Sequence, residues 1–467
     1  MDIPVDCQQL QLPLERTIAD FQNHTDVNQL LLQVRTVVFT FIEKLLASVI
    51  QQLLYDRFFL ATLKVLAAKS ALRFKGFRPT SIRLLSGQSI PIDSPYFAKA
   101  PPKAHRGRKS KKRKAKTGCH LGLSYLGFIG RCSGVLTSSA VQAALLCPSF
   151  EIARRTLLSF GIEMNIKTLR RLCMNMGSQA IEHRHRIALS EADGVENRQL
   201  FVCIDGGRLR ERRPKRGRPP AGQKRQGYYT DWREPTQIVI QWLDADGGPC
   251  KHTVPLYDAT MAGIDAAFEL LEGYLRKIDA SKADFVVFCA DGARGYWKRF
   301  SSLAKKLEIP GHCEVIDYTH AKQNLKRVTD NLPKKLGSKK LAAITKVWKN
   351  LLWQGKLSEI DNQIRRFITS RAKRKQALKK FENYFLKNYH RMQYAAFRYL
   401  NLPTGSGCVE SAIRRVINLR LKSPGIFWKR ETAEIMLFLR STLLCGRWHI
   451  MLKNLLKLNR GQFGDCH

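Results

Sequence analysis

Three short strand-like runs in the middle of this chain are each followed by an aspartate, and the first two of these runs are apolar. The runs cover residues 199–204, 284–290 and 311–316, and the aspartates that follow them are Asp205, Asp291 and Asp317. Apolar runs of this length, bounded by turn residues such as glycine, are typical of buried β-strands. A carboxylate at the end of a strand stands on a rigid element and faces solvent or a ligand. The pattern therefore predicts a sheet that presents acids at its strand ends.

The rest of this region predicts a mixed α/β unit that is split by helices. Two more strands are expected at 235–243 and 250–256, and an amphipathic helix at 262–278. Residues 321–400 then return to a helical pattern rich in Lys and Arg, with interleaved aromatic residues. The break at 403–407 opens a last helical stretch. We therefore expect an α/β fold with a mixed sheet interrupted by an all-helical insertion.

The N-terminal part reads as helical, with one strongly basic interruption. Helical spacing of apolar residues extends over 8–75, whereas residues 101–117 are mostly Lys and Arg. That basic segment is either a solvated tether or a phosphate-binding arm. The segments expected from the sequence are an N-terminal helical region (1–100), a basic arm (101–117), a helical unit (118–195), the first part of the α/β domain (196–325), the helical insertion (326–402) and the C-terminal part of the α/β domain (403–467).

Residues 149–182 predict two short helices separated by Gly161. Ser149 is placed to cap the first helix, and the second begins near Asn165. This spacing resembles a helix-turn-helix. The exposed face of the second helix would carry Lys167, Arg170 and Arg171. Such a pair either reads DNA or serves simple packing, and the sequence leaves both open.

The charge of the chain points to a polyanionic partner. It has 80 Lys and Arg against 38 Asp and Glu, for a net charge of +42. Nucleic acid is the usual reason, because each neutralised phosphate releases a condensed counterion. A membrane surface is less suitable, because the cations are spread along the whole chain.

The N-terminal segment, the apolar run at 36–50 and the cysteines favour a cytoplasmic protein. The N-terminus has no basic segment of a signal peptide, and the apolar run 36–50 contains Glu43 and Lys44. The twelve cysteines form no Cys-x-x-Cys pair, which suits core residues in a reducing compartment. The nearest cluster, Cys119 with His120 and Cys132, has the wrong spacing for a zinc ribbon or finger.

Glu410 is a further acidic candidate, and it lies outside the predicted strands. It follows a Gly-Ser-Gly segment on an expected helix, with Thr404 or Ser406 as the cap. On that helix Glu410, Arg414 and Asn418, spaced by four, would form a polar stripe. One Asp at a strand end is usually a cap or turn residue. Several acids in one α/β unit, however, can hold two Mg²⁺ ions for in-line attack on a phosphodiester.

Two further features bear on DNA binding. Arg216-Gly217-Arg218-Pro219 resembles the core of an AT-hook, in which two arginines lie in a narrow A·T minor groove. It lies between the first two strands, so it is expected in a protruding hairpin loop. The alternative to an AT-hook is a soluble basic loop without a specific DNA contact. The aromatic residues within 343–400 either form a helical core or stack on bases.

Several motifs in one order resemble a known family. The blocks are Val-Cys-Ile-Asp-Gly-Gly (202–207), Ala-Asp-Gly-Ala (290–293), Val-Ile-Asp-Tyr-Thr-His (315–320), Thr-Gly-Ser-Gly-Cys-Val-Glu-Ser (404–411) and Arg-Leu-Lys-Ser-Pro-Gly-Ile-Phe-Trp (420–428). Together they resemble the DDE transposases of bacterial insertion sequences, nearest to the Kra-type group and more distantly to Mutator-like enzymes. The resemblance covers about residues 145–450 and implies a ribonuclease H-like catalytic domain.

The resemblance implies specific roles for the acids. Asp205, Asp291 and Glu410 would hold Mg²⁺ or Mn²⁺, and Asp317 with His320 would match an accessory Asp-x-x-His signature. Asp317 also follows a strand, so it competes with Asp291 for the place of second metal ligand.

The resemblance also implies an activity and its partners. A homo-oligomer would cleave double-stranded DNA at the element's terminal inverted repeats and join it to target DNA in the bacterial cytoplasm, at the nucleoid. Cations such as Arg414 would neutralise developing charge on the phosphate. A non-catalytic DNA-binding or regulatory protein derived from such an enzyme, and a structure-selective nuclease, are the alternatives.

Overall fold

The computed structural model describes residues 8–24, 26–99, 118–223, 226–292 and 294–460. The chain divides into two compact units, one formed by residues 1–180 and 452–467 and the other by residues 181–451. This division is coarser than the six segments expected from the sequence. The basic arm at 101–117 lies outside the described residues.

The first unit begins with three helices and a hairpin. The elements are α1 (Gln8–His24), α2 (Val27–Tyr55), α3 (Arg57–Lys69), β1 (Leu72–Ile82) and β2 (Ile90–Lys99). The strands pair antiparallel. The helical expectation for 8–75 is therefore wrong after Lys69. Ala71 takes a positive φ of 53°, which ends the helix, and from Leu72 apolar and basic residues alternate with the period of a strand.

Helix α2 is long and apolar enough to cross a membrane by length and composition. Its Glu43, however, is buried within this unit. The Glu43 carboxylate accepts hydrogen bonds from the backbone N–H of Leu85 and of Ser86, each at 2.5 Å. It also accepts one from the Ser86 hydroxyl at 2.6 Å. These bonds tie α2 to the loop between β1 and β2, so α2 is an integral part of the folded unit.

A bundle of short helices completes the first unit. It consists of α4 (Leu121–Tyr125), α5 (Gly134–Leu146), α6 (Phe150–Ser159), α7 (Ile166–Ile181) and α18 (Trp448–Asn459). The predicted helix pair is confirmed. The Ser149 side chain caps α6 by accepting from the Ile152 N–H, and Asn165 accepts from the Thr168 N–H at 2.8 Å. Gly161 turns the chain between them with φ +74°.

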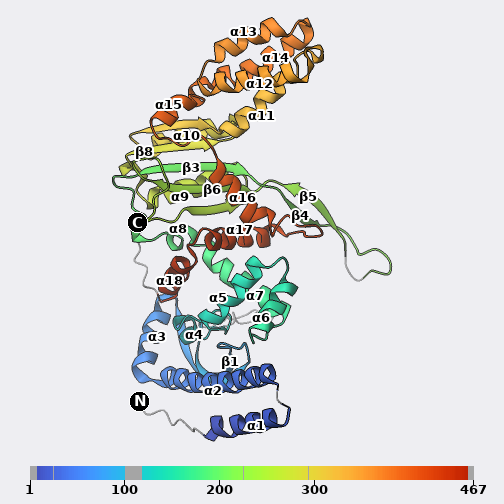
Figure 1. Cartoon of the computed structure of the whole chain (residues 1–467). Coiled ribbons are helices and arrows are strands. Elements are labelled where there is room, and N and C mark those ends of the chain that lie inside the picture. Colours follow the sequence, from blue (N-terminus) through green and yellow to red (C-terminus); the bar gives the residue numbers. More distant parts are fainter. Residues whose placement is uncertain (1–7, 25, 100–117, 224–225, 293, 461–467) are drawn as a thin grey trace. The chain divides into compact units, whose positions relative to one another are not determined.

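The second unit is built on a five-stranded mixed sheet, which can be followed in Figure 1. Its strands are β3 (Gln199–Gly206), β6 (Thr236–Leu243), β7 (Leu256–Thr260), β8 (Phe285–Ala290) and β9 (His312–Ile316). Their order is β7-β6-β3-β8-β9. Strands β3, β8 and β9 are parallel to one another, whereas β6 is antiparallel to β3 and β7 is antiparallel to β6. The expected mixed α/β sheet is confirmed.

One strand lies elsewhere than expected. The sequence predicts a strand at 250–256, but β7 begins at Leu256. All five residues of β7 are buried, including Asp258 and Thr260. The buried Asp258 and Thr260 interrupt the apolar pattern of β7, so apolar periodicity does not mark this strand in the sequence. The helices that pack against β6 and β7 are α9 (Ile264–Lys277), α16 (Gly407–Ile413) and α17 (Arg430–Leu444).

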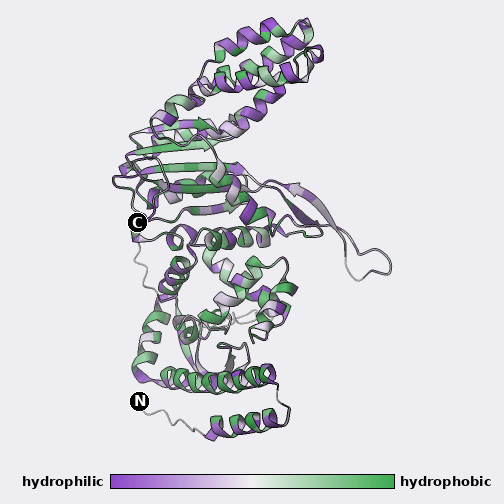
Figure 2. Ribbon diagram, in the orientation of Figure 1, coloured by the Kyte–Doolittle hydropathy of each residue, from purple (hydrophilic) through white to green (hydrophobic). Residues whose placement is uncertain are grey.

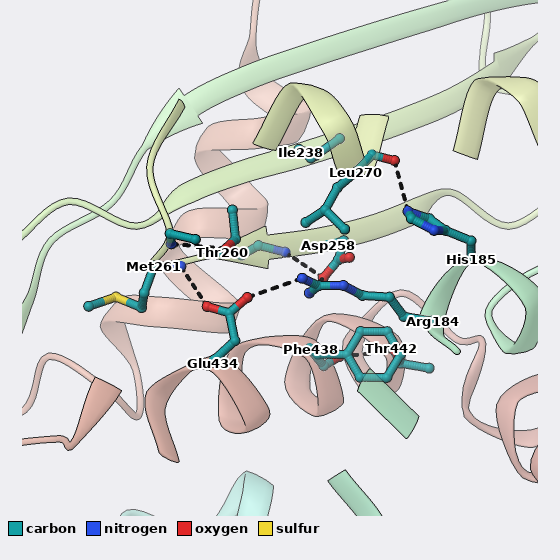
Figure 3. Close-up of polar contacts among 12 residues, drawn as sticks. Arg184, His185, Ile238, Asp258, Thr260, Met261, Leu270, Glu434, Phe438 and Thr442 are labelled. Carbon is teal, nitrogen blue, oxygen red and sulfur yellow. Dashed lines mark hydrogen bonds and ion pairs between the residues drawn. The ribbon is translucent and has the colours of Figure 1, made fainter. Parts of the chain in front are cut away.

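A buried polar network around Asp258 holds these layers together (Figure 3). Arg184, from the short helix α8 (Arg184–Ile187), forms ion pairs with Asp258 at 3.4 Å and with Glu434 of α17 at 3.2 Å. The Tyr274 hydroxyl of α9 donates to Asp258 at 2.9 Å. The Met261 N–H donates to Glu434 at 2.7 Å. A buried carboxylate needs such partners, and here they join α8, α9 and α17 to β7.

Two insertions extend from the sheet. The strands β4 (Leu209–Pro214) and β5 (Tyr228–Arg233) pair antiparallel and form an arm, which confirms the predicted hairpin. The arm is largely hydrophilic (Figure 2). The helical insertion contains α11 (Tyr318–Thr329), α12 (Gly337–Trp353), α13 (Leu357–Phe367), α14 (Arg371–Tyr384) and α15 (Tyr394–Tyr399). Several of its aromatic residues are fully buried, which supports a core role for Trp348, Phe381, Phe385 and Tyr394.

Candidate metal centre at the strand ends

The predicted acids follow three neighbouring strands that run in the same direction. Asp205 is the next-to-last residue of β3, Asp291 directly follows β8, and Asp317 directly follows β9. Since β3, β8 and β9 are parallel neighbours, their carboxyl ends lie at one edge of the sheet. The topology thus brings together aspartates that lie far apart in the sequence.

Asp205 shows how closely the acidic groups gather. Burial raises the pKa of its carboxyl to about 6, and the charges of Asp291 and Glu410 act in the same direction. The Gly206 N–H, which donates to Asp205 Oδ1 at 2.7 Å, and the charge of His320 oppose that rise. The net rise in the pKa of Asp205 therefore comes mainly from burial, with the two nearby acids adding to it.

Asp317 is bound on both of its oxygens by the protein itself. It is 1% exposed. Its Oδ2 accepts from the His320 backbone N–H at 2.9 Å and contacts His320 Nδ1 at 2.8 Å. Its Oδ1 accepts from the Ser406 N–H at 2.9 Å. These bonds outweigh burial and lower the pKa of Asp317, while the same contact raises the pKa of His320. Asp317 thereby caps α11 and joins it to the segment before α16.

Asp291 lies in a tight turn that the helical insertion supports. Gly292 has φ +95°, a conformation that favours glycine. The Tyr384 hydroxyl, at the end of α14, donates to the Asp291 carbonyl oxygen at 3.0 Å. A Cβ atom at Gly292 would come within 2.9 Å of the Tyr384 ring. The glycine is thus required both by the turn and by the approach of the insertion.

Glu410 approaches the same edge from α16. The helix packs against β3 and β6 through buried residues such as Val409 and Ala412, whereas Glu410 is exposed. The potential ligand atoms of Asp317, His320 and Glu410 all lie within 4.8 Å of one another. This close group contains two of the acids predicted from the sequence, Asp317 and Glu410.

Ser406 occupies the N-cap position of α16, one of the two positions expected, but its side chain makes no cap bond and its N–H donates to Asp317. The expected α-helix is shorter than predicted, because α16 ends at Ile413 and residues 414–418 form a π-helix. Arg414 is exposed at the start of that turn. π-Helical turns are frequent at functional sites.

Three site residues were missed by sequence reasoning, namely Glu234, Tyr296 and Tyr384. A Cβ atom at Gly206 would lie 2.2 Å from Glu234 Oε1, so this glutamate closely approaches the end of β3. Burial raises the pKa of Tyr296, as do the charges of Asp291, Asp205 and Glu234. The sequence did contain a signal for Glu234. Strands β3 and β6 pair antiparallel, so residues just before β6 must lie near the end of β3 where Asp205 stands.

The predicted DNA-contacting cations fall in both compact units. Lys167, Arg170 and Arg171 are all exposed on α7 of the first unit. Arg216 and Arg218 are exposed in the loop of the β4–β5 arm, in the second unit. The arm also pairs cations with aromatic rings, at 5.5 Å for Arg210 over Trp232, 5.8 Å for Arg212 over Tyr228 and 5.3 Å for Lys215 over Tyr229.

Comparisons with known proteins add little to this geometry. No family model matches the chain, and no curated protein matches it. A match among solved structures is the Drosophila P element transposase strand transfer complex, with a TM-score of 0.26 and 12% sequence identity, covering 69% of this chain and 81% of that chain. At this TM-score the likeness carries no argument about fold or function.

Proposed function

We propose that this chain is a DDE transposase that cleaves and transfers DNA strands with divalent metal ions, using a ribonuclease H-like catalytic domain. The observation that carries the proposal is that Asp205 and Asp291 lie at the carboxyl ends of parallel strands while the charge of Glu410, from α16, acts on Asp205. The mixed sheet, split by helices before Glu410, agrees with the resemblance of the sequence to insertion-sequence transposases.

The acidic edge fits a hard divalent cation. Its donors are carboxylate oxygens, the ligands that Mg²⁺ and Mn²⁺ favour. Burial raises the pKa of Asp205, with a smaller contribution from Asp291 and Glu410, and a bound cation would stabilise its ionised form. Asp205, Asp291 and Glu410 would hold the ions, which would supply activation of the attacking oxygen and stabilisation of the leaving one.

The remaining site residues serve positioning and charge. Asp317 holds His320 through its Nδ1 contact and keeps its pKa raised, so the imidazole carries positive charge further toward neutral pH. That charge would stabilise an anionic phosphate beside the acids. The exposed Arg414, four residues after Glu410 in the chain, would add a second cation.

Double-stranded DNA is the proposed substrate. A net charge of +42 suits a polyanion, and the exposed cations of α7 and of the arm offer phosphate and groove contacts. The element's terminal inverted repeats and a target duplex would be bound by a homo-oligomer. The like-charged acids favour an enzyme over a regulatory DNA-binding protein, because binding alone gains nothing from repelling carboxylates.

A cleavage and joining assay tests the proposal. A supercoiled plasmid that carries the element ends is incubated with the protein and Mg²⁺, and the products are separated on a gel. Strand joining is expected. Nicking of DNA junctions without joining would indicate a structure-selective nuclease, and binding without cleavage would contradict any enzymatic function.

Single variants in that assay separate the roles of the acids. Asp205→Asn, Asp291→Asn and Glu410→Gln are each expected to lower the rate at least a hundredfold, because each removes a metal ligand. The control is Glu196→Gln, an exposed acid in the loop before β3, which should retain full activity. Full activity in Asp291→Asn, together with loss in Asp317→Asn, would assign the second metal ligand to Asp317.

A further inference from the structure

A cysteine stands two residues before each of the three proposed metal ligands. The pairs are Cys203 and Asp205, Cys289 and Asp291, and Cys408 and Glu410. The proposed function makes no use of these thiols. The three thiols lie on β3, on β8 and on α16, and each is two residues from a proposed ligand.

The fold gathers the three thiols into one cluster. Cys203 and Cys289 are partners in the β3–β8 register, and both are fully buried. Cys408 reaches them from α16, with its Sγ 3.5 Å from the Cys203 Sγ. Because residues two apart on a strand point to the same face, Cys203 lies on the same face of β3 as Asp205. Cys408 is only partly buried, so solvent reaches the cluster from its side.

We propose that Cys203 and Cys408 form an oxidation site whose disulfide joins β3 to α16. All three thiols of the cluster are free, and Cys203 and Cys408 have a sulfur separation of 3.5 Å. A disulfide bond is about 2.05 Å long, so the two sulfurs need to approach by about 1.5 Å. Side-chain rotation and a small shift of α16 supply such a movement.

The chemistry balances with a peroxide as oxidant. The Cys408 sulfur, which is the more accessible, attacks one oxygen of hydrogen peroxide, becomes a sulfenic acid and releases hydroxide. The Cys203 sulfur then displaces the sulfenic oxygen, so that the S–S bond forms as the S–O bond breaks. With the two thiol protons, both oxygens leave as water. Two thiols and one peroxide thus give one disulfide and two water molecules.

The disulfide would disturb the acidic edge. Asp205 and Glu410 lie two residues from the joined sulfurs, on the two elements that the bond pulls together. Metal and catalytic sites tolerate displacements of only about 0.5 Å. Oxidation would therefore weaken metal binding, and reduction would restore it. This consequence rests on the proposed function, whereas the disulfide itself does not.

The first test is chemical. The full chain is treated with hydrogen peroxide, its remaining thiols are blocked with N-ethylmaleimide, and its peptides are analysed by mass spectrometry without reduction. A peptide pair linked through Cys203 and Cys408 is expected, and dithiothreitol should abolish it. Cys408→Ser should abolish it too, whereas the matched control Cys289→Ser should retain it. A Cys203–Cys289 link, or sulfinic acid at Cys408 without any link, would overturn the proposal.

The second test measures Mn²⁺ binding by electron paramagnetic resonance, without DNA. Oxidation is expected to weaken Mn²⁺ binding at least tenfold in the wild type and to leave Cys408→Ser unchanged. If the linked protein bound Mn²⁺ as well as the reduced protein, the coupling between the disulfide and the acids would be refuted. If the reduced protein bound no Mn²⁺, the proposed function would fail, and the linked peptide would still decide the oxidation site.

Discussion

Asp205 and Asp317 both stand at the ends of predicted strands, yet the fold shifts the pKa values of their carboxyls in opposite directions. Asp317 receives N–H groups on both oxygens, so its ionised form is stabilised and its pKa lowered. Burial raises the pKa of Asp205 to about 6, because the single Gly206 N–H bond and the charge of His320 do not offset burial and the charges of Asp291 and Glu410. Asp317 therefore suits a structural role, and Asp205 suits a cation.

The raised pKa of Asp205 has a consequence for stability that can be measured. Its ionised form is less favourable in the folded chain than in the unfolded chain. The contribution of this carboxyl to stability is fully present below its ordinary pKa of 3.8 and is lost as the pH rises through about 6. Around neutral pH the folded protein therefore holds an unfavourable charge, as functional sites often do.

Asp205→Asn should therefore stabilise the metal-free protein. The expected gain in the free energy of unfolding is about 2–3 kcal/mol at pH 7.5, and roughly half of that at pH 5, where the carboxyl is largely protonated in the folded state. Urea unfolding in the presence of a chelator measures both values. An equal effect at the two pH values would show that the carboxyl does not titrate near 6.

At the scale of elements, the apolar runs located most of the central sheet. Strands β3, β6 and β8 were predictable because their residues are mostly apolar and almost wholly buried, whereas only the last two residues of β9, Val315 and Ile316, are buried. Strand β7 was misplaced because Asp258 and Thr260 are buried within it. The partners that permit their burial, such as Arg184 and Tyr274, come from distant segments and cannot be read locally.

The candidate site was predictable to a similar degree, and for the same reason. The strand-end acids follow from local pattern, and the parallel register brings them together. Tyr384 was not predictable as a site residue, because only the packing of the helical insertion brings it to the Asp291 turn. The π-helix after α16 likewise leaves no signal in apolar periodicity.

The β4–β5 arm supports a prediction about DNA binding. The variant Arg216→Ala/Arg218→Ala should weaken binding to A·T-rich duplex DNA about tenfold. It should also reduce the slope of log K against log salt by about 2, because each lost phosphate contact accounts for about 0.9. Fluorescence anisotropy at several salt concentrations measures both quantities.

A control separates this effect from net charge. Lys282 is an exposed cation that lies before β8 and outside the arm. Lys282→Ala should leave both the affinity and the salt slope nearly unchanged. An unchanged slope in the double arginine variant would show that the arm makes no contact with DNA phosphates.

At the scale of the whole molecule, the net charge of +42 works against the fold. Like charges repel more strongly in a compact chain than in an expanded one, and salt screens this repulsion over a Debye length of about 10 Å at 0.1 M.

Raising NaCl from 50 to 500 mM should therefore raise the melting temperature by a few degrees. A short DNA duplex at low salt should raise it further, because it binds the folded state and neutralises the same cations. Calorimetry with and without DNA measures both shifts, and a melting temperature that falls with added salt would show that ion pairs outweigh the repulsion.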